Sequence, residues 1–223
     1  MSKKVIKKVI LLTVLCVILS AISAMGTSCI DTSNKNPVVT MNLDPDTDSG
    51  VTGSFQIELF ADKAPNSVNF FIELINEGFY TECVTNKVVA GHLVEISEPW
   101  YLKKGDKVIE GEFEDNGYTG NDVEFVRGTV GFILYPDEKG NIDNNSAVGS
   151  FFVVLSDEAG KTYIGNRVAI GKIVSGIEIL DQISQIKNYP NYQPITSAKI
   201  KDASVDLKGS TYPAAITSKR EIY

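Results

Sequence analysis

The residue types that most often perform covalent or metal chemistry are scarce in this chain. It contains one histidine, His92, and three cysteines, Cys16, Cys29 and Cys83. A Ser-His-Asp or Cys-His nucleophile would have to use His92, and a metal site with several histidine ligands is impossible. The sequence therefore allows at most one histidine-based nucleophile and excludes a multi-histidine metal centre.

An acidic segment is the second place where chemistry could reside. Asp44, Asp46 and Asp48 alternate along the chain, as the first ligands of a calcium-binding loop do. That loop also needs glycine at its sixth position and glutamate at its twelfth, where this chain has Ser49 and Phe55. We expect a solvated turn between two strands here, and no metal site.

The composition is that of a folded, acidic protein. The 223 residues are 43% hydrophobic and 22% charged, which is typical of a globular chain. The net charge is −7, but the first 28 residues contain four lysines and no acid, so the remainder carries −11. Phosphate backbones repel such a surface, and we therefore expect no nucleic-acid partner.

The amino-terminal segment has the pattern of an export signal. Residues 1–8 are basic, and residues 9–22 form a nearly uninterrupted apolar run. That run matches a secretory signal and is shorter than the roughly 20 residues that span a bilayer. We predict a signal peptide over 1–28 and an exported protein.

Two kinds of processing fit the residues that follow the apolar run. Cleavage after Ala24 would release a secreted protein, whereas Cys29, preceded by Gly26-Thr-Ser, resembles the lipidated first residue of a bacterial lipoprotein. Residues 29–37 are polar and suit a flexible tether, so we favour a lipid anchor on Cys29 and a position at the cell membrane. A disulfide between Cys29 and Cys83 is the alternative.

The rest of the chain has the alternating pattern of a β-rich domain. A helix is expected to open at Ala64-Pro-Asn-Ser67 and to stop at Gly78, and a second helix is expected over 176–186. Many strands around two helices suggest one closed barrel over 38–209, with a loosely attached tail over 210–223. Strands are expected over 38–43, 53–60, 83–89, 92–96, 107–113, 128–134, 150–155, 168–174 and 197–207.

The order of short motifs resembles the cyclophilin family of peptidyl-prolyl cis-trans isomerases. The resemblance covers nearly the whole chain after the signal segment and implies a closed eight-stranded antiparallel β-barrel capped by two α-helices, with substrate on the outer face. The motifs that carry it are Gly53-Ser-Phe-Gln-Ile-Glu-Leu-Phe60, Ala64-Pro-Asn-Ser-Val-Asn-Phe-Phe71, Gly78-Phe-Tyr80, Gly111-Glu-Phe113, Asn116-Gly117, Arg127-Gly-Thr-Val130, Asn145-Ser-Ala147, Phe151-Phe152 and Gly171-Lys-Ile-Val-Ser-Gly176.

The chemistry that the resemblance implies is rotation about the bond that precedes a proline. Its barrier is about 18–20 kcal/mol, because the amide C–N bond is partly double. A catalyst holds the prolyl ring in an apolar pocket and places a cation where it can donate to the prolyl nitrogen in the twisted state. No cofactor or metal is needed.

The resemblance places the catalytic cation on Lys87, where the family has an arginine. Lysine keeps the charge but lacks the planar fork of donors. Glu95 stands at a substrate-holding glutamine and replaces amide donors with a charged acceptor. His92 replaces a phenylalanine of the pocket wall, and Leu93 replaces a methionine.

Other expected substrate-binding positions are a mixture of retained and altered residues. Phe152 retains a pocket phenylalanine, Ser150 stands at a second binding glutamine, and Ile133 stands at a small pocket alanine. Tyr163 replaces an apolar leucine, and Arg167 occupies a position where histidine is frequent. The groove has changed chemically, whereas the barrel pattern persists.

Three hypotheses about function follow. The first is a lipid-anchored, monomeric isomerase that assists the folding of exported proteins by acting on proline-containing segments with a degenerate site. The second is a non-catalytic module that binds peptides or proteins at the cell envelope. The third is a barrel that acts only as a structural spacer.

Overall fold

The structure is a computed structural model that describes residues 36–99 and 106–219. All of them belong to one compact unit, residues 35–223, and the other unit, residues 1–34, lies outside the described part. The expected signal peptide, Cys29 and most of the expected tether therefore also lie outside it. Within the described ranges, no helix has the length and apolar character needed to cross a membrane.

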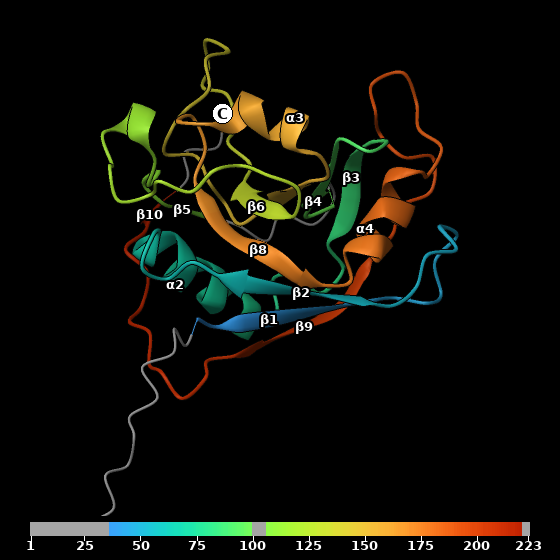
Figure 1. The fold of residues 1–223 in the computed structure, drawn as a ribbon, viewed down its shortest axis with the longest axis horizontal. Coiled ribbons are helices and arrows are strands. Elements are labelled where there is room, and N and C mark those ends of the chain that lie inside the picture. Colours follow the sequence, from blue (N-terminus) through green and yellow to red (C-terminus); the bar gives the residue numbers. More distant parts are fainter. Residues whose placement is uncertain (1–35, 100–105, 220–223) are drawn as a thin grey trace, which may run out of the picture. The chain divides into compact units, whose positions relative to one another are not determined.

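Alternating side chains produce the strands. In β1 (Val38–Leu43), Val39 and Met41 are fully buried, whereas the intervening Thr40 and Asn42 are partly exposed. Eight strands form one antiparallel sheet in the order β3-β4-β7-β6-β8-β2-β1-β9 (Figure 1). The other seven are β2 (Ser54–Leu59), β3 (Val84–Val89), β4 (Leu93–Ser97), β6 (Thr129–Phe132), β7 (Phe151–Val154), β8 (Ala169–Ser175) and β9 (Ile200–Asp206).

The two end strands of the sheet, β3 and β9, meet through the residues that precede β9. Val84 forms a bridge with Lys199, and the Thr85 amide donates to the Ala198 carbonyl at 2.9 Å. The sheet therefore curls into a barrel. The expected eight-stranded antiparallel barrel is confirmed, although its closure consists of this bridge and a few backbone hydrogen bonds rather than a full ladder.

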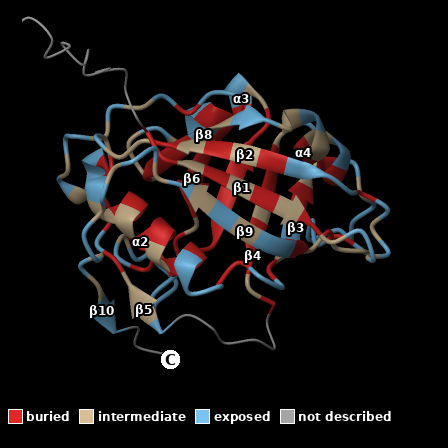
Figure 2. Ribbon diagram, turned by 90° about the horizontal axis from the view of Figure 1, so that it is seen from below, coloured by how far each residue is buried: buried red, intermediate tan, exposed pale blue. Residues whose placement is uncertain are grey.

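Two helices cover opposite ends of the barrel, as expected (Figures 1 and 2). Helix α2 (Pro65–Asn76) begins with a proline, whose missing amide hydrogen costs nothing in the first turn. Helix α4 (Ile177–Ser184) buries Leu180 and Ile183. The remaining helical segments are single turns: α3 (Asp157–Gly160), η1 (Glu114–Asn116) and η2 (Lys161–Tyr163).

A carboxylate caps the start of α2. The Asn66 and Ser67 amides donate to Glu112 Oε1 and Oε2 at 3.0 and 2.7 Å. These amides have no partner inside the helix, so the buried Glu112 satisfies them and its charge also favours the helix dipole. The strand expected over 107–113 is much shorter than predicted: only β5 (Lys107–Val108) forms, followed by an isolated bridge between Ile109 and Ala147, and Glu112 instead faces α2.

The core inside the barrel is dominated by aromatic rings. Phe71 of α2 lies between Tyr80, Phe132 and Phe151, with ring centroids 4.9, 5.9 and 5.7 Å away. All four side chains are at most 1% exposed. Burying such rings contributes much of the hydrophobic stabilisation and fixes α2 against β6 and β7.

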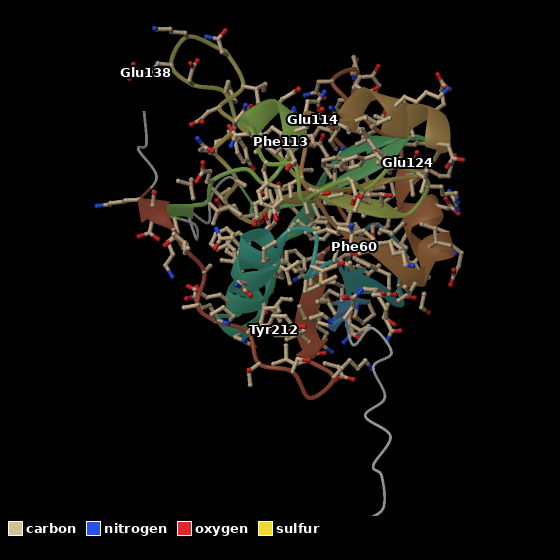
Figure 3. The ribbon with its side chains drawn as sticks, turned by 60° about the vertical axis from the view of Figure 1, so that its left-hand side comes forward. Phe60, Phe113, Glu114, Glu124, Glu138 and Tyr212 are labelled. Carbon is tan, nitrogen blue, oxygen red and sulfur yellow. The ribbon has the colours of Figure 1, made fainter. Side chains whose placement is uncertain are left out.

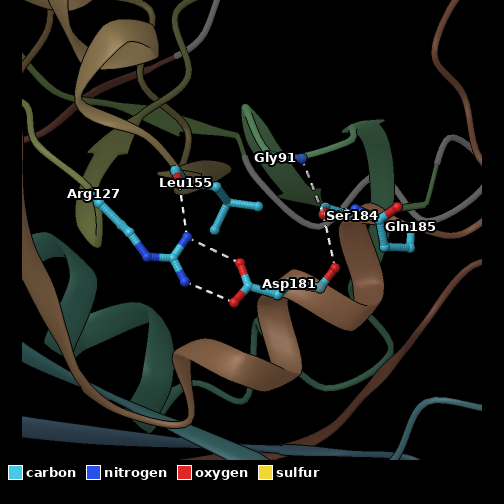
Figure 4. Close-up of polar contacts among 6 residues, drawn as sticks. All are labelled: Gly91, Arg127, Leu155, Asp181, Ser184 and Gln185. Carbon is cyan, nitrogen blue, oxygen red and sulfur yellow. Dashed lines mark hydrogen bonds and ion pairs between the residues drawn. The ribbon is translucent and has the colours of Figure 1, made fainter.

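Arg127, in the loop that precedes β6, links α4 to the rest of the barrel (Figure 4). The two Nη atoms of Arg127 donate to the Asp181 carboxylate at 3.0 and 2.7 Å, and Nη1 also donates to the Leu155 carbonyl at 2.7 Å. The planar fork of arginine suits this bidentate geometry. Further along α4, Ser184 Oγ accepts from the Gly91 amide at 3.4 Å, next to the β3–β4 turn.

The tail after residue 209 is attached to the domain, contrary to the expectation. Tyr212 packs against the core inside the barrel (the main core; Figure 3). Strand β10 (Ser218–Lys219) pairs with β5 (Figure 1). The Ala215 amide donates to Glu73 Oε2 at 3.2 Å. The hydrogen bond from Lys107, followed by that from the Ala215 amide, lowers the pKa of the Glu73 carboxyl, against the opposing effect of burial. The sequence of the tail is polar and turn-rich, and its attachment depends on partners more than 100 residues away.

Candidate functional site

A single row of facing residues crosses the outer surface of the sheet. Lys87 on β3 pairs with Glu95 on β4, and Glu95 pairs with Phe152 on β7. Phe152 in turn pairs with Gly131 on β6, and Gly131 pairs with Ala169 on β8. Directly paired residues of neighbouring strands project to the same side. The sheet thus brings a cation, a carboxylate and an aromatic ring side by side.

The cation and the carboxylate form an ion pair. Lys87 Nζ lies 3.4 Å from Glu95 Oε1, and 38% and 20% of the two side chains are exposed. A pair this exposed contributes about 0–1 kcal/mol to stability. The ammonium group is therefore available to another acceptor at a modest cost.

The aromatic ring belongs to a small second core on the outside of the sheet. Phe125 stacks on Phe152 with ring centroids 5.8 Å apart and an interplanar angle of 13°. A Cβ at Gly131 would lie 2.8 Å from Phe152 and 2.9 Å from Phe125, so only glycine leaves room for both rings. Val154, Ala159 and Ala169 complete the buried part of this outer cluster.

Tyr163 of η2 lies over the same ring. Its centroid is 4.5 Å from that of Phe152, and Phe152 is only 3% exposed. Burial is the main factor that raises the pKa of the Tyr163 hydroxyl, and the charge of Glu95 adds to it while that of Arg167 opposes it. Tyr163, Glu95 and Arg167 therefore share one electrostatic environment.

The remaining expected site residues occupy the same outer surface or its edge. Leu93 and Ile133 lie two residues from Glu95 and Gly131, so they follow the same alternation. Ser150 is fully buried, and its hydroxyl is 2.9 Å from that of Tyr135. His92 lies in the β3–β4 turn, where its carbonyl accepts from the Leu155 amide at 2.8 Å.

Phe125 is a site residue that sequence reasoning missed. It lies outside any strand, so the alternation that identifies strand faces gave it no role. A signal was present, because Val123 and Phe125 are two apolar residues spaced by two just before the Arg127-Gly128 motif. Both pack on the outer cluster.

The acidic turn over residues 44–50 is largely exposed to solvent, as predicted. Asp44 Oδ1 accepts from the Asp46 amide at 3.0 Å, and Asp44 Oδ2 pairs with Lys199 at 2.6 Å. The hydrogen bond from Lys199 is the main factor that lowers the pKa of Asp44. Among residues 36–99 and 106–219, no three His, Cys, Asp or Glu side chains come together as metal ligands.

This arrangement is one that could act on a peptide without a nucleophile. A partly exposed ammonium stands next to an aromatic, apolar cluster on the outer side of the sheet, where Phe125 and Tyr163 cover most of Phe152. Such a surface can bind an apolar ring and donate to an atom of the adjoining amide.

The comparisons with known proteins identify the class to which this fold and surface belong. Residues 42–205 match the family model described as cyclophilin type peptidyl-prolyl cis-trans isomerase/CLD. The chain therefore belongs to the cyclophilin-type peptidyl-prolyl cis-trans isomerase family.

Similar proteins agree with this assignment. Peptidyl-prolyl cis-trans isomerase A of Dickeya dadantii is 30% identical over 66% of this chain and 76% of its own length. Peptidyl-prolyl cis-trans isomerase-like 3 of Gallus gallus is 24% identical over 69% of this chain and 90% of its own length.

The fold is also that of solved cyclophilin structures. A cyclophilin-type isomerase of Cryptosporidium parvum superposes with a TM-score of 0.60 and 21% identity, covering 77% of this chain and 98% of that one. A second structure of that protein, determined in the presence of the dipeptide Ala-Pro, gives a TM-score of 0.60 at 21% identity, covering 76% of this chain and 98% of that one.

Proposed function

We propose that this protein is an exported, lipid-anchored, monomeric peptidyl-prolyl isomerase that assists the folding of exported proteins. Uncatalysed isomerisation takes tens of seconds or longer, which is slow enough to limit folding. The observation that carries the proposal is the row on the outer sheet surface, in which Lys87 and Glu95 lie beside Phe152. The family assignment supplies the reaction.

In this proposal Lys87 is the catalytic residue. As the peptide bond twists, the prolyl nitrogen becomes pyramidal, and its lone pair, no longer delocalised into the carbonyl, can accept a hydrogen bond. The Lys87 ammonium donates to it, while the prolyl ring binds at Leu93 and Phe152. Both side chains are 3% exposed, so the ring must displace Tyr163 or bind beside it. Glu95 competes for the same ammonium, so we expect a weaker catalyst than one with a neutral residue there.

The lipid anchor is supported by the environment of Cys83. Its Sγ is fully buried and lies 3.3 Å from the Phe79 carbonyl. A disulfide with Cys29 would require Cys83 to leave the core or Cys29 to enter it, which favours lipidation of Cys29 over the disulfide. Mass spectrometry of the amino terminus of membrane-extracted protein tests this: diacylated Cys29 is expected, and an unmodified amino terminus at residue 25 contradicts it.

Isomerase activity is tested with full-length protein in detergent and a proline-containing tetrapeptide in a coupled assay. We expect acceleration that Lys87→Ala abolishes. The matched control is Lys172→Ala, which removes a lysine that pairs with Glu58 at 3.9 Å on other strands of the sheet. Equal loss of activity in both variants would remove Lys87 from its proposed role.

A second candidate function is a binding module without turnover. It is favoured by the covering of Phe152 by Phe125 and Tyr163, which leaves 3% of that side chain exposed. A prolyl ring would have to displace Tyr163 or bind beside it. Peptide binding by calorimetry without acceleration in the coupled assay would favour this function.

A further inference from the structure

Arg167 is a half-buried cation at the edge of the outer cluster. Ala169 lies in that cluster, whereas Val168 and Ile170 lie in the main core, so Arg167 follows the outward alternation. Its Nη1 donates to the Asn166 carbonyl at 2.6 Å and approaches Asn166 Oδ1 at 3.5 Å. Among the described residues, the guanidinium has no other hydrogen-bond acceptor and forms no ion pair.

The donors of Arg167 that form no hydrogen bond within the described residues lie close enough to the carboxylate of Glu95 to feel its charge. Burial lowers the pKa of Arg167, and the charges of Tyr163 and Glu95 act in the opposite direction. Glu95 is already paired with Lys87, so one carboxylate serves two cations. A half-buried guanidinium whose remaining donors face solvent gains most from a carboxylate, which can accept two of its hydrogen bonds.

We propose that Arg167 is a specificity-determining residue that selects peptides carrying a carboxylate next to the proline. This inference rests on the proposed peptide-binding surface, and not on turnover there. The carboxylate could come from an Asp or Glu side chain or from a carboxyl terminus that directly follows the proline. Either source would place a charged acceptor beside Tyr163 and Arg167.

The proposal is tested by the affinity of full-length protein for three labelled peptides. They are Ala-Glu-Pro-Ala amide, Ala-Gln-Pro-Ala amide, and Ala-Gln-Pro with a free carboxyl terminus. We expect about five-fold tighter binding of the first or the third than of the second, the size of one partly exposed charge-assisted contact. The peptide that gains identifies the source of the carboxylate.

Variants separate this role from general charge effects. Arg167→Gln should abolish the preference, and Arg167→Lys should reduce it because the fork is lost. The control Lys161→Gln removes a 67% exposed lysine of the neighbouring η2 and should leave the preference unchanged. Glu95→Gln should increase the preference for a carboxylate-bearing peptide, because a competing carboxylate is removed.

Failure of the specificity proposal can be told from failure of isomerisation. Equal affinities for the three peptides, no binding of any of them, or a preference that survives in Arg167→Gln would overturn the role of Arg167. If the carboxylate preference depends on Arg167 but no acceleration is measured, the specificity proposal stands and the isomerase proposal fails.

Discussion

Exchanging both charges of the outer ion pair should raise isomerase activity. In the double variant Lys87→Arg with Glu95→Gln, the cation regains a planar fork and loses its competitor. The present pair, with an Nζ–Oε1 distance of 3.4 Å and side chains 38% and 20% exposed, is worth about 0–1 kcal/mol. A substrate must overcome that amount to engage Lys87, so removing it yields up to about five-fold in kcat/KM.

The arginine fork adds a second contribution. A further donor to the twisted amide is worth about 1 kcal/mol when its partner is neutral and partly exposed. The two changes together should therefore raise kcat/KM by about 5- to 30-fold. The gain should appear mainly in kcat, because the added donor acts in the transition state more than in the ground state.

The assay is isomerisation of an Ala-Pro tetrapeptide, followed by a protease-coupled method and, independently, by NMR exchange. The matched control is Lys172→Arg with Glu58→Gln, which makes the same exchange in the pair on β8 and β2. The control should match the unmodified protein. An unchanged or lower rate in a folded Lys87→Arg, Glu95→Gln variant would refute the role given to this pair.

Three further predictions concern stability. Gly131→Ala places a methyl group 2.8 Å from the Phe152 ring, and it should lower the free energy of unfolding by about 1–3 kcal/mol in urea titrations; a neutral effect would contradict the packing described. The carboxylate of Glu73 has a lowered pKa, so its contribution is present above its ordinary value of 4.5 and is lost as the pH falls through the folded value. The protection factor of the Ala215 amide against hydrogen exchange should therefore fall in acid, and in Glu73→Gln it should already be low at pH 7; equal protection in both proteins would disprove the attachment. Arg127→Lys loses the bidentate contact with α4 and should cost about 1 kcal/mol in thermal unfolding, because the pair is partly exposed; an unchanged midpoint would argue against this tie.

Local patterns in the sequence predicted most of the elements. Alternation located β1 (Val38–Leu43) and β9 (Ile200–Asp206), and the proline start with an apolar stripe located α2 (Pro65–Asn76). These patterns work because each strand or helix must bury one face, which fixes residue types at short range. Most observed strands begin one to three residues later than expected, whereas β4 and β8 end one residue beyond the expected ranges.

Long-range contacts explain the errors. The local sequence pattern predicts that Glu112 lies in a strand, but its carboxylate caps a helix that begins 47 residues earlier in the chain. The sequence predicts a loosely attached tail, but the tail bonds to Glu73 and pairs with β5. Neither partner can be identified from neighbours in the sequence, because both depend on how the barrel closes.

By itself the sequence determined the strand and helix pattern, and its motif order indicated the family to which the chain belongs. It also determined the types of side chain on the outer surface, including a lysine, a glutamate and a retained phenylalanine. Only the tertiary structure decided that Lys87, Glu95 and Phe152 lie in one row, that Phe125 and Tyr163 cover the ring, and that Arg167 shares their environment. The physical reason is that periodicity assigns a residue to a face, whereas strand register and loop packing determine which residues on that face meet.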